Sequence, residues 1–273
     1  MRTFKLIAVS LICSSLCLIS CNKAEDERDS SDNQIDRATR YIDQGQYDSA
    51  INILEDVIQK EDNHRARMIL ASAYAGRTGI RVETYWDFLV GFDAFAKNRT
   101  PQDFPDLIPA NKIPSSLDEK GKDLFKRINE QFKELQRLQK KADKIPTVTT
   151  AQRKDLAQAR IVLTPLTTPG SKLYRALLAA VMIKSDFTRG ERLIQSWSQT
   201  QFNLCQPVAT DLANWLWQTL SLASDGLNDA GQAYPEENDG YQRIRRDIGI
   251  GLRALQSVNT SQNLTESLCV LQK

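Results

Sequence analysis

Histidine, glycine and proline are all scarce in this sequence. Its 273 residues include 1 His, 12 Gly and 9 Pro. One histidine cannot build a multi-histidine metal site, and Cys205 and Cys269 are too far apart for zinc-finger spacing. The sequence also has no Gly-x-Ser-x-Gly elbow, Walker loop or dinucleotide fingerprint. We therefore expect a protein that is not an enzyme and that carries no metal or other cofactor.

The alternation of apolar and polar residues that marks β-strands is missing as well. Apolar residues instead recur at spacings of three and four, which predicts an all-α fold. Beyond the N-terminal third, we expect helices over residues 116–144, 152–163, 173–183, 188–200, 211–223 and 241–258. The fifth of these is expected to end near Gly226, because glycine inside a helix costs about 1 kcal/mol relative to alanine.

The first twenty residues have the order of a secretory signal. A short basic segment (residues 1–5) precedes an apolar run (residues 6–18), which is too short to span a bilayer as a helix. Leu18-Ile-Ser-Cys21 then resembles the lipobox of bacterial lipoproteins. The resemblance implies cleavage before Cys21 and acylation of Cys21 by diacylglycerol or palmitate chains, which would hold the protein on a membrane. The alternatives are an ordinary signal peptide and a buried apolar N-terminus.

Residues 21–33 follow as a lipidated cysteine and a charged segment without large apolar side chains. Such a segment cannot bury enough surface to fold, so we expect a flexible tether. Because Asn22 stands where inner-membrane retention would require Asp, the lipobox resemblance implies the outer membrane, facing the periplasm. Without Arg2 and Lys5, 34 basic residues balance 34 acidic ones. A neutral chain lacks the basic footprint that nucleic-acid binding needs.

Two cysteines remain in the mature chain outside the acylation site. Cys205 and Cys269 form an even pair in an oxidising compartment, which favours a disulfide. It would close a loop of about 64 residues and contribute about 4 kcal/mol in the chain-entropy model. The alternative is two separately buried thiols.

Residues 34–273 are expected to form one helical domain that begins with paired helices. Ala38 and Tyr41 share one helical face, Gly45 breaks the helix, and Tyr47 and Ala50 begin a second apolar stripe. Small residues that face aromatic ones let two antiparallel helices approach closely. This pattern resembles the tetratricopeptide repeat. It covers residues 34–96, but one full repeat and half of another predict an irregular helical-hairpin domain.

The pattern changes after Gly76, where an aromatic-rich stretch occupies residues 84–96. Its large side chains lie nearly all round a helix, so the stretch is either a buried central helix or one wall of an apolar ligand groove. Under the second interpretation, the groove would be formed by Tyr85, Trp86, Phe88 and Phe92, with Arg77 or Arg81 meeting a carboxylate.

These features lead to two functional hypotheses. The first is a membrane-anchored periplasmic scaffold that binds a protein or peptide partner in the bacterial envelope. The second comes from Leu70-Ala-Ser-Ala-Tyr-Ala-Gly-Arg-Thr-Gly-Ile80, which is similar to accessory lipoproteins of TRAP-type transporters. That resemblance implies an all-α body with a ligand channel, and a small organic acid as the ligand.

Overall fold

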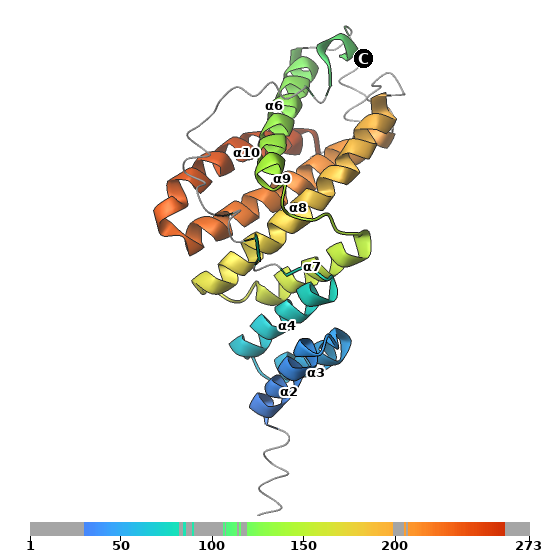
Figure 1. Ribbon diagram of the computed structural model, residues 1–273. Coiled ribbons are helices and arrows are strands. Elements are labelled where there is room, and N and C mark those ends of the chain that lie inside the picture. The colour runs from blue at the N-terminus through green and yellow to red at the C-terminus, as the bar shows by residue number, and fades with distance from the viewer. Residues whose placement is uncertain are drawn as a thin grey trace, which may run out of the picture. The chain divides into compact units, whose positions relative to one another are not determined.

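The computed structural model describes residues 30–81, 84–85, 89, 106, 108–113, 115, 119–198, 205 and 207–259. Within these ranges every regular element is helical: eight α-helices, packed as adjacent hairpins, and two 3-10 turns (Figure 1). The predicted all-α fold is confirmed. The chain divides into two compact units, Met1–Arg77 and Thr78–Lys273. We call them the N-terminal and C-terminal units.

The described part of the N-terminal unit contains helices α2 (Ser31–Asp43), α3 (Tyr47–Lys60) and α4 (His64–Arg77), each packed on the other two. The side chain of Ser30 caps α2 by accepting a hydrogen bond from the backbone N–H of Asn33. Gly45 then has a φ of 74°, a left-handed conformation that suits glycine, and the chain turns into α3.

The core of the N-terminal unit follows the predicted stripes. Ala38, Ala50 and Leu54 are fully buried, and α2 packs on α3. Gly76 lies inside α4, one residue before the helix ends at Arg77. A Cβ at Gly76 would lie 2.4 Å from Cε1 of Tyr47, so the glycine makes room for the tyrosine ring.

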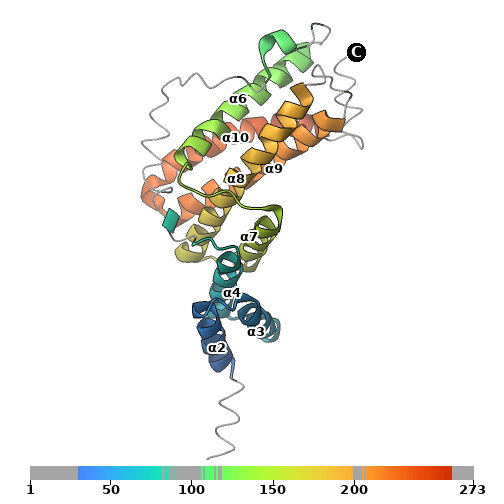
Figure 2. The same ribbon diagram turned by 45° about the vertical axis from the view of Figure 1, so that its right-hand side comes forward.

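The C-terminal unit is arranged around two long helices, α8 (Pro169–Ser198) and α9 (Pro207–Ala233), which lie side by side (Figures 1 and 2). Helix α7 (Thr150–Leu163) packs on α8, and α10 (Asn238–Asn259) packs on α9. Helix α6 (Glu119–Lys141) contacts both α10 and α8. The 3-10 turns are η2 (Ala110–Lys112) and η3 (Pro235–Glu237).

Helices α6 and α7 agree with the apolar spacing in the sequence. Phe125, Phe132, Leu135 and Leu138 are buried along one face of α6, as the stripe predicted. Helix α7 begins at Thr150, two residues before the predicted start. Thr149 and Gln152 cap it reciprocally, since each side chain bonds the backbone N–H of the other.

Helix α8 is continuous, whereas the sequence predicted two helices with a break after residue 183. The residues of the expected break make tertiary contacts that keep them helical. Asp186 accepts two hydrogen bonds of 2.7 Å from Arg153 of α7. The hydroxyl of Ser185 accepts a 2.6 Å hydrogen bond from the N–H of Val148. The side chains of Ser185 and Asp186 could have capped a new helix, but they instead bond to α7 and to the residues just before it.

Helix α9 also runs past its predicted end at Gly226 and continues to Ala233. A Cβ at Gly226 would lie 2.9 Å from the Cβ of Ala179 on α8, so this glycine permits close packing of the two helices. The side chain of Asn238 likewise packs against Gly231, and a Cβ added at Gly231 would lie 2.4 Å from Oδ1 of Asn238. The connection between α9 and α10 is therefore shorter than the predicted helix ranges 211–223 and 241–258 indicated. Among the described helices, none is long and apolar enough to cross a membrane.

Candidate functional site

The residues that the sequence singled out do not come together in the described structure. Trp86, Phe88, Phe92, Cys21 and Cys269 all lie outside the described residues. The groove and the lipidation of Cys21 therefore stay predictions.

The remaining predicted site residues are described but belong to different surroundings. Arg77 is in the N-terminal unit, where it pairs with Asp48 (Nη1 to Oδ1, 2.6 Å) and lies over the ring of Tyr74. Tyr85 is half-buried and Arg81 is exposed, both in the C-terminal unit. Cys205 is disulfide-bonded. Its pairing with Cys269 stays a prediction.

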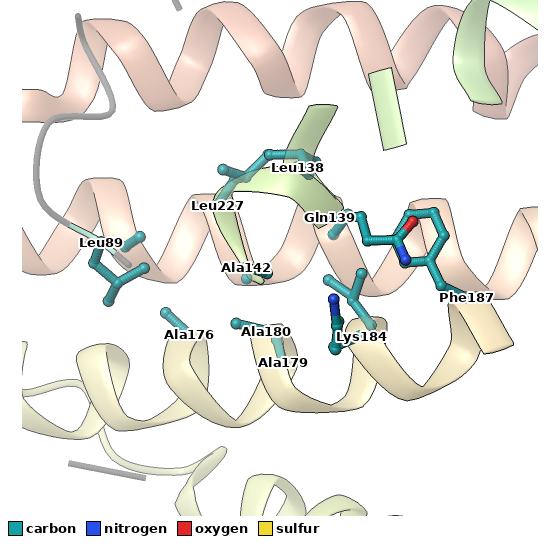
Figure 3. Close-up of a pocket in the computed structure, with 14 residues that line it drawn as sticks. Leu89, Leu138, Gln139, Ala142, Ala176, Ala179, Ala180, Lys184, Phe187 and Leu227 are labelled. Carbon is teal, nitrogen blue, oxygen red and sulfur yellow. The ribbon is translucent and has the colours of Figure 1, made fainter. Parts of the chain in front are cut away.

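A narrow apolar slot lies between α8, α9 and the end of α6. Figure 3 shows Ala176, Ala179 and Ala180 of α8 facing it, with Leu89 at one end and Phe187 at the other. The cavity volume is only about 30 Å³, roughly what one water molecule occupies in the liquid. The slot is thus a consequence of close packing by small residues and is too small for an organic ligand.

A larger and more polar pocket opens where α7, α8 and α9 meet, with a volume of about 420 Å³. We call it the Arg160 pocket. Its lining residues are Ala157, Arg160 and Ile161 from α7, Thr164 directly after α7, Arg175 and Met182 from α8, and Asp225, Asn228 and Asp229 from α9. Spacings of three, four and seven residues place each set on one face of its helix, so three helix faces converge on one space.

One wall of the Arg160 pocket is fixed by a buried ion pair. Arg175 donates hydrogen bonds to both carboxylate oxygens of Asp229, and its Nη1 donates to the carbonyl of Thr164 at 3.2 Å. Asp229 is only 4% exposed, and this burial raises the pKa of Asp229, although the hydrogen bonds from Arg175 act in the opposite direction. These hydrogen bonds connect α8 with α9 and with the end of α7, and the carboxylate of Asp229 neutralises the charge of Arg175.

Arg160 has no such partner. Its guanidinium makes no hydrogen bond or ion pair with any described residue, and its Nε is buried and unpaired. Burial lowers the pKa of Arg160, while the negative charges of Asp225 and Asp229 partly oppose that shift. A half-buried guanidinium with an unmet donor is costly for a folded protein, because desolvating a charge without a close counter-charge costs several kcal/mol.

Asp225 is the second charged group of the pocket without a direct partner. It is exposed and, within the described part of the chain, accepts no hydrogen bond and forms no ion pair. Its negative charge raises the pKa of Arg160 and so opposes the effect of burial, although the two side chains form no ion pair. Beside them lie Ile161, which is 60% exposed, and Met182, which is buried. The pocket thus offers one positive, one negative and one apolar position, an arrangement suited to binding a small charged molecule.

No protein-family model, curated protein or solved structure matches the chain. The described residues also contain no group of three or more His, Cys, Asp or Glu side chains placed to hold a metal ion.

The Arg160 pocket was not predicted from the sequence. One local signal was present, because Arg175 interrupts the apolar run 173–183 and Asp229 lies within a mostly apolar helix. Charged residues at such positions must pair or face a cavity. The sequence could not show which faces of α7, α8 and α9 pack against one another. This packing decides whether Arg160 lies next to a carboxylate.

Proposed function

We propose that this chain is a non-enzymatic binding protein, anchored to a bacterial membrane through acylated Cys21, that holds a small ligand in the Arg160 pocket. The observation that carries the binding function is the guanidinium of Arg160, which is half-buried and lacks a hydrogen-bond partner among the described residues. A ligand with a negative group would supply the missing counter-charge. The anchor is supported by the lipobox-like Leu18–Cys21 and the charged tether after it.

The size of the pocket favours a solute over a broad protein surface. Small-molecule sites typically have volumes of about 300–1,000 Å³, and the volume here is about 420 Å³. The large exposed fraction of Ile161 supports access from solvent without opening of the helical core. Of the two functional hypotheses, the ligand-binding accessory of a solute transporter, similar to TRAP-type accessory lipoproteins, therefore fits the pocket better.

A scaffold that binds an envelope protein or peptide is the second candidate. The observation that favours it is Trp217 on α9, whose side chain is 41% exposed. Tryptophan is enriched among the residues that dominate protein–protein binding energies. A single exposed aromatic side chain is a smaller feature than a complete pocket, so this function ranks second.

The two functions can be separated by photocrosslinking in the intact cell envelope. A photoreactive amino acid is placed at Ile161 in the pocket, at Trp217 on α9, or at the exposed control position Glu191 on α8. We expect a small adduct, seen by intact-protein mass spectrometry, from position 161 alone. A discrete protein adduct from position 217 would favour the scaffold. Equal yields from all three positions would contradict both functions.

The anchor is tested separately by labelling cells with an alkyne-modified fatty acid. We expect the wild-type chain to be labelled and to sediment with membranes, and the Cys21→Ser variant to lose both properties. If the variant is labelled and sediments as the wild type does, the proposed anchor is wrong.

A further inference from the structure

We propose that the Arg160 pocket recognises an aliphatic α-amino acid, with the ligand carboxylate on Arg160, its ammonium group on Asp225 and its side chain against Ile161 and Met182. This inference rests on the proposed function, since it names the ligand class of the same pocket. It goes beyond that function by assigning each part of the ligand to one residue.

The charge balance of the pocket argues for a ligand that carries both signs. Arg175 and Asp229 neutralise each other through paired hydrogen bonds, so neither is available to a ligand. Arg160 and Asp225 remain, with opposite charges and without a direct partner among the described residues. A zwitterion satisfies both groups and leaves the pocket neutral.

Ligands with a single charge fit less well for a definite reason. A simple carboxylate bound to Arg160 would bring a second negative charge close to Asp225. Phosphate, with about two negative charges, would leave a still larger negative excess in the pocket. An amine bound to Asp225 would leave Arg160 desolvated and still unpaired. Because like charges repel and an unpaired buried charge is costly, the zwitterion is the preferred class.

The geometry of Arg160 decides which of its atoms can meet the carboxylate. Its Nε is covered by protein, so the donors left for a ligand are those of the two Nη groups. Two parallel N–H donors match the two oxygens of a carboxylate, which is the usual bidentate arrangement of arginine. In an α-amino acid one carbon separates the carboxylate from the ammonium group. Both groups of such a ligand can therefore reach charged side chains that line the same pocket.

The apolar side of the pocket selects the ligand side chain. Ile161 is 60% exposed, an unusual fraction for isoleucine on a helix that is otherwise docked on α8. An aliphatic side chain that covers Ile161 would remove apolar surface from water, at about 25 cal/mol for each Å² buried. Ala157, whose side chain is small, also lines the pocket one helical turn before Ile161.

The test measures binding of three probes to the full acylated chain in detergent micelles by calorimetry. The probes are leucine, 4-methylpentanoate (leucine without its amino group) and 3-methylbutylamine (leucine without its carboxylate). We expect leucine to bind at least about tenfold more tightly than either single-charge probe, because each charge-assisted hydrogen bond contributes that much or more.

Variants assign the two charges to their residues. Arg160→Gln should weaken leucine and 4-methylpentanoate by about tenfold or more. Asp225→Asn should weaken leucine and 3-methylbutylamine but not 4-methylpentanoate. Arg189→Gln, an exposed arginine of α8 outside the pocket, is the matched control and should change nothing. Arg160→Lys keeps the positive charge but lacks the planar guanidinium with its paired N–H donors. Circular dichroism checks that each variant is folded.

The outcomes separate this inference from the proposed function. If 4-methylpentanoate binds as tightly as leucine and Asp225→Asn has no effect, the zwitterion inference is overturned and the pocket stays a carboxylate site. If no probe binds but position 161 still captures a small adduct, the ligand class is wrong and the proposed function stands. If no probe binds and position 161 captures nothing, the proposed function fails too.

Discussion

Gly190 offers the sharpest test of how the C-terminal unit is packed. It lies inside α8, where the indole ring of Trp215 on α9 covers it. A Cβ at Gly190 would lie 2.1 Å from Cζ2 and 2.4 Å from Cε2 of that ring. The ring cannot easily move away, because Trp215 is 1% exposed and its Nε1–H donates a 2.7 Å hydrogen bond to the carbonyl of Asp186. We therefore predict that Gly190→Ala destabilises the protein.

The expected magnitude follows from three opposing contributions. Overpacking a core by one methyl group typically costs about 1–3 kcal/mol. Losing or stretching the buried hydrogen bond of Trp215 costs about 1–3 kcal/mol more. Alanine recovers about 1 kcal/mol, because it is a better helix former than glycine. The net loss in the free energy of unfolding should be about 1–5 kcal/mol.

Urea unfolding followed by tryptophan fluorescence measures this loss under non-reducing conditions. All four tryptophans belong to the C-terminal unit, so the signal reports on that unit alone. Gly170→Ala is the matched control, since it lies in the first turn of the same helix with no atom within 4 Å of an added Cβ. It should be neutral or stabilise by up to about 1 kcal/mol. A Gly190→Ala variant as stable as this control would refute the packing argument.

Three further predictions concern buried polar groups and the disulfide. Asn129 accepts a hydrogen bond from the N–H of Ile108 and donates one to its carbonyl, both 2.9 Å, so Asn129→Asp should lower the free energy of unfolding by roughly 2–4 kcal/mol in urea titrations. Burial raises the pKa of Asp229 above 3.8, so the folded state holds this proton more tightly than the unfolded chain does. Relative to Asp229→Asn, the wild type should therefore lose stability as the pH rises from 3.8 through the folded pKa, and the opposite slope in pH-dependent urea unfolding would contradict this sign. Non-reducing digestion and mass spectrometry should recover one peptide pair joined through Cys205 and Cys269, whereas a free thiol at Cys269 would exclude that pair.

Most helices could be predicted because their cause is local. An apolar stripe at spacings of three and four depends only on residues that are close together in the sequence. Phe132, Leu135 and Leu138 of α6 are an example, and all three are buried. The turn at Gly45 was predictable for the same reason, since its φ of 74° is a conformation that glycine adopts without strain. Neither inference requires knowledge of a distant contact.

Helix ends were harder to predict, because a glycine can either end a helix or lie inside one at a point of close packing. At Gly45 it ends a helix, but at Gly226 it lies inside α9, where a Cβ would press on Ala179 of α8. The sequence around each glycine does not distinguish the two cases. The difference depends on a helix nearly fifty residues away, which only the folded chain brings close.

The candidate site shows the same division. The sequence by itself determined that the chain is helical and where its amphipathic stripes run. Only the tertiary structure decided that Arg175 pairs with Asp229, while Arg160 and Asp225 line the same pocket without a partner among the described residues. The physical reason is that secondary structure follows from neighbours along the chain. Pairing and burial of charges follow instead from which helix faces meet.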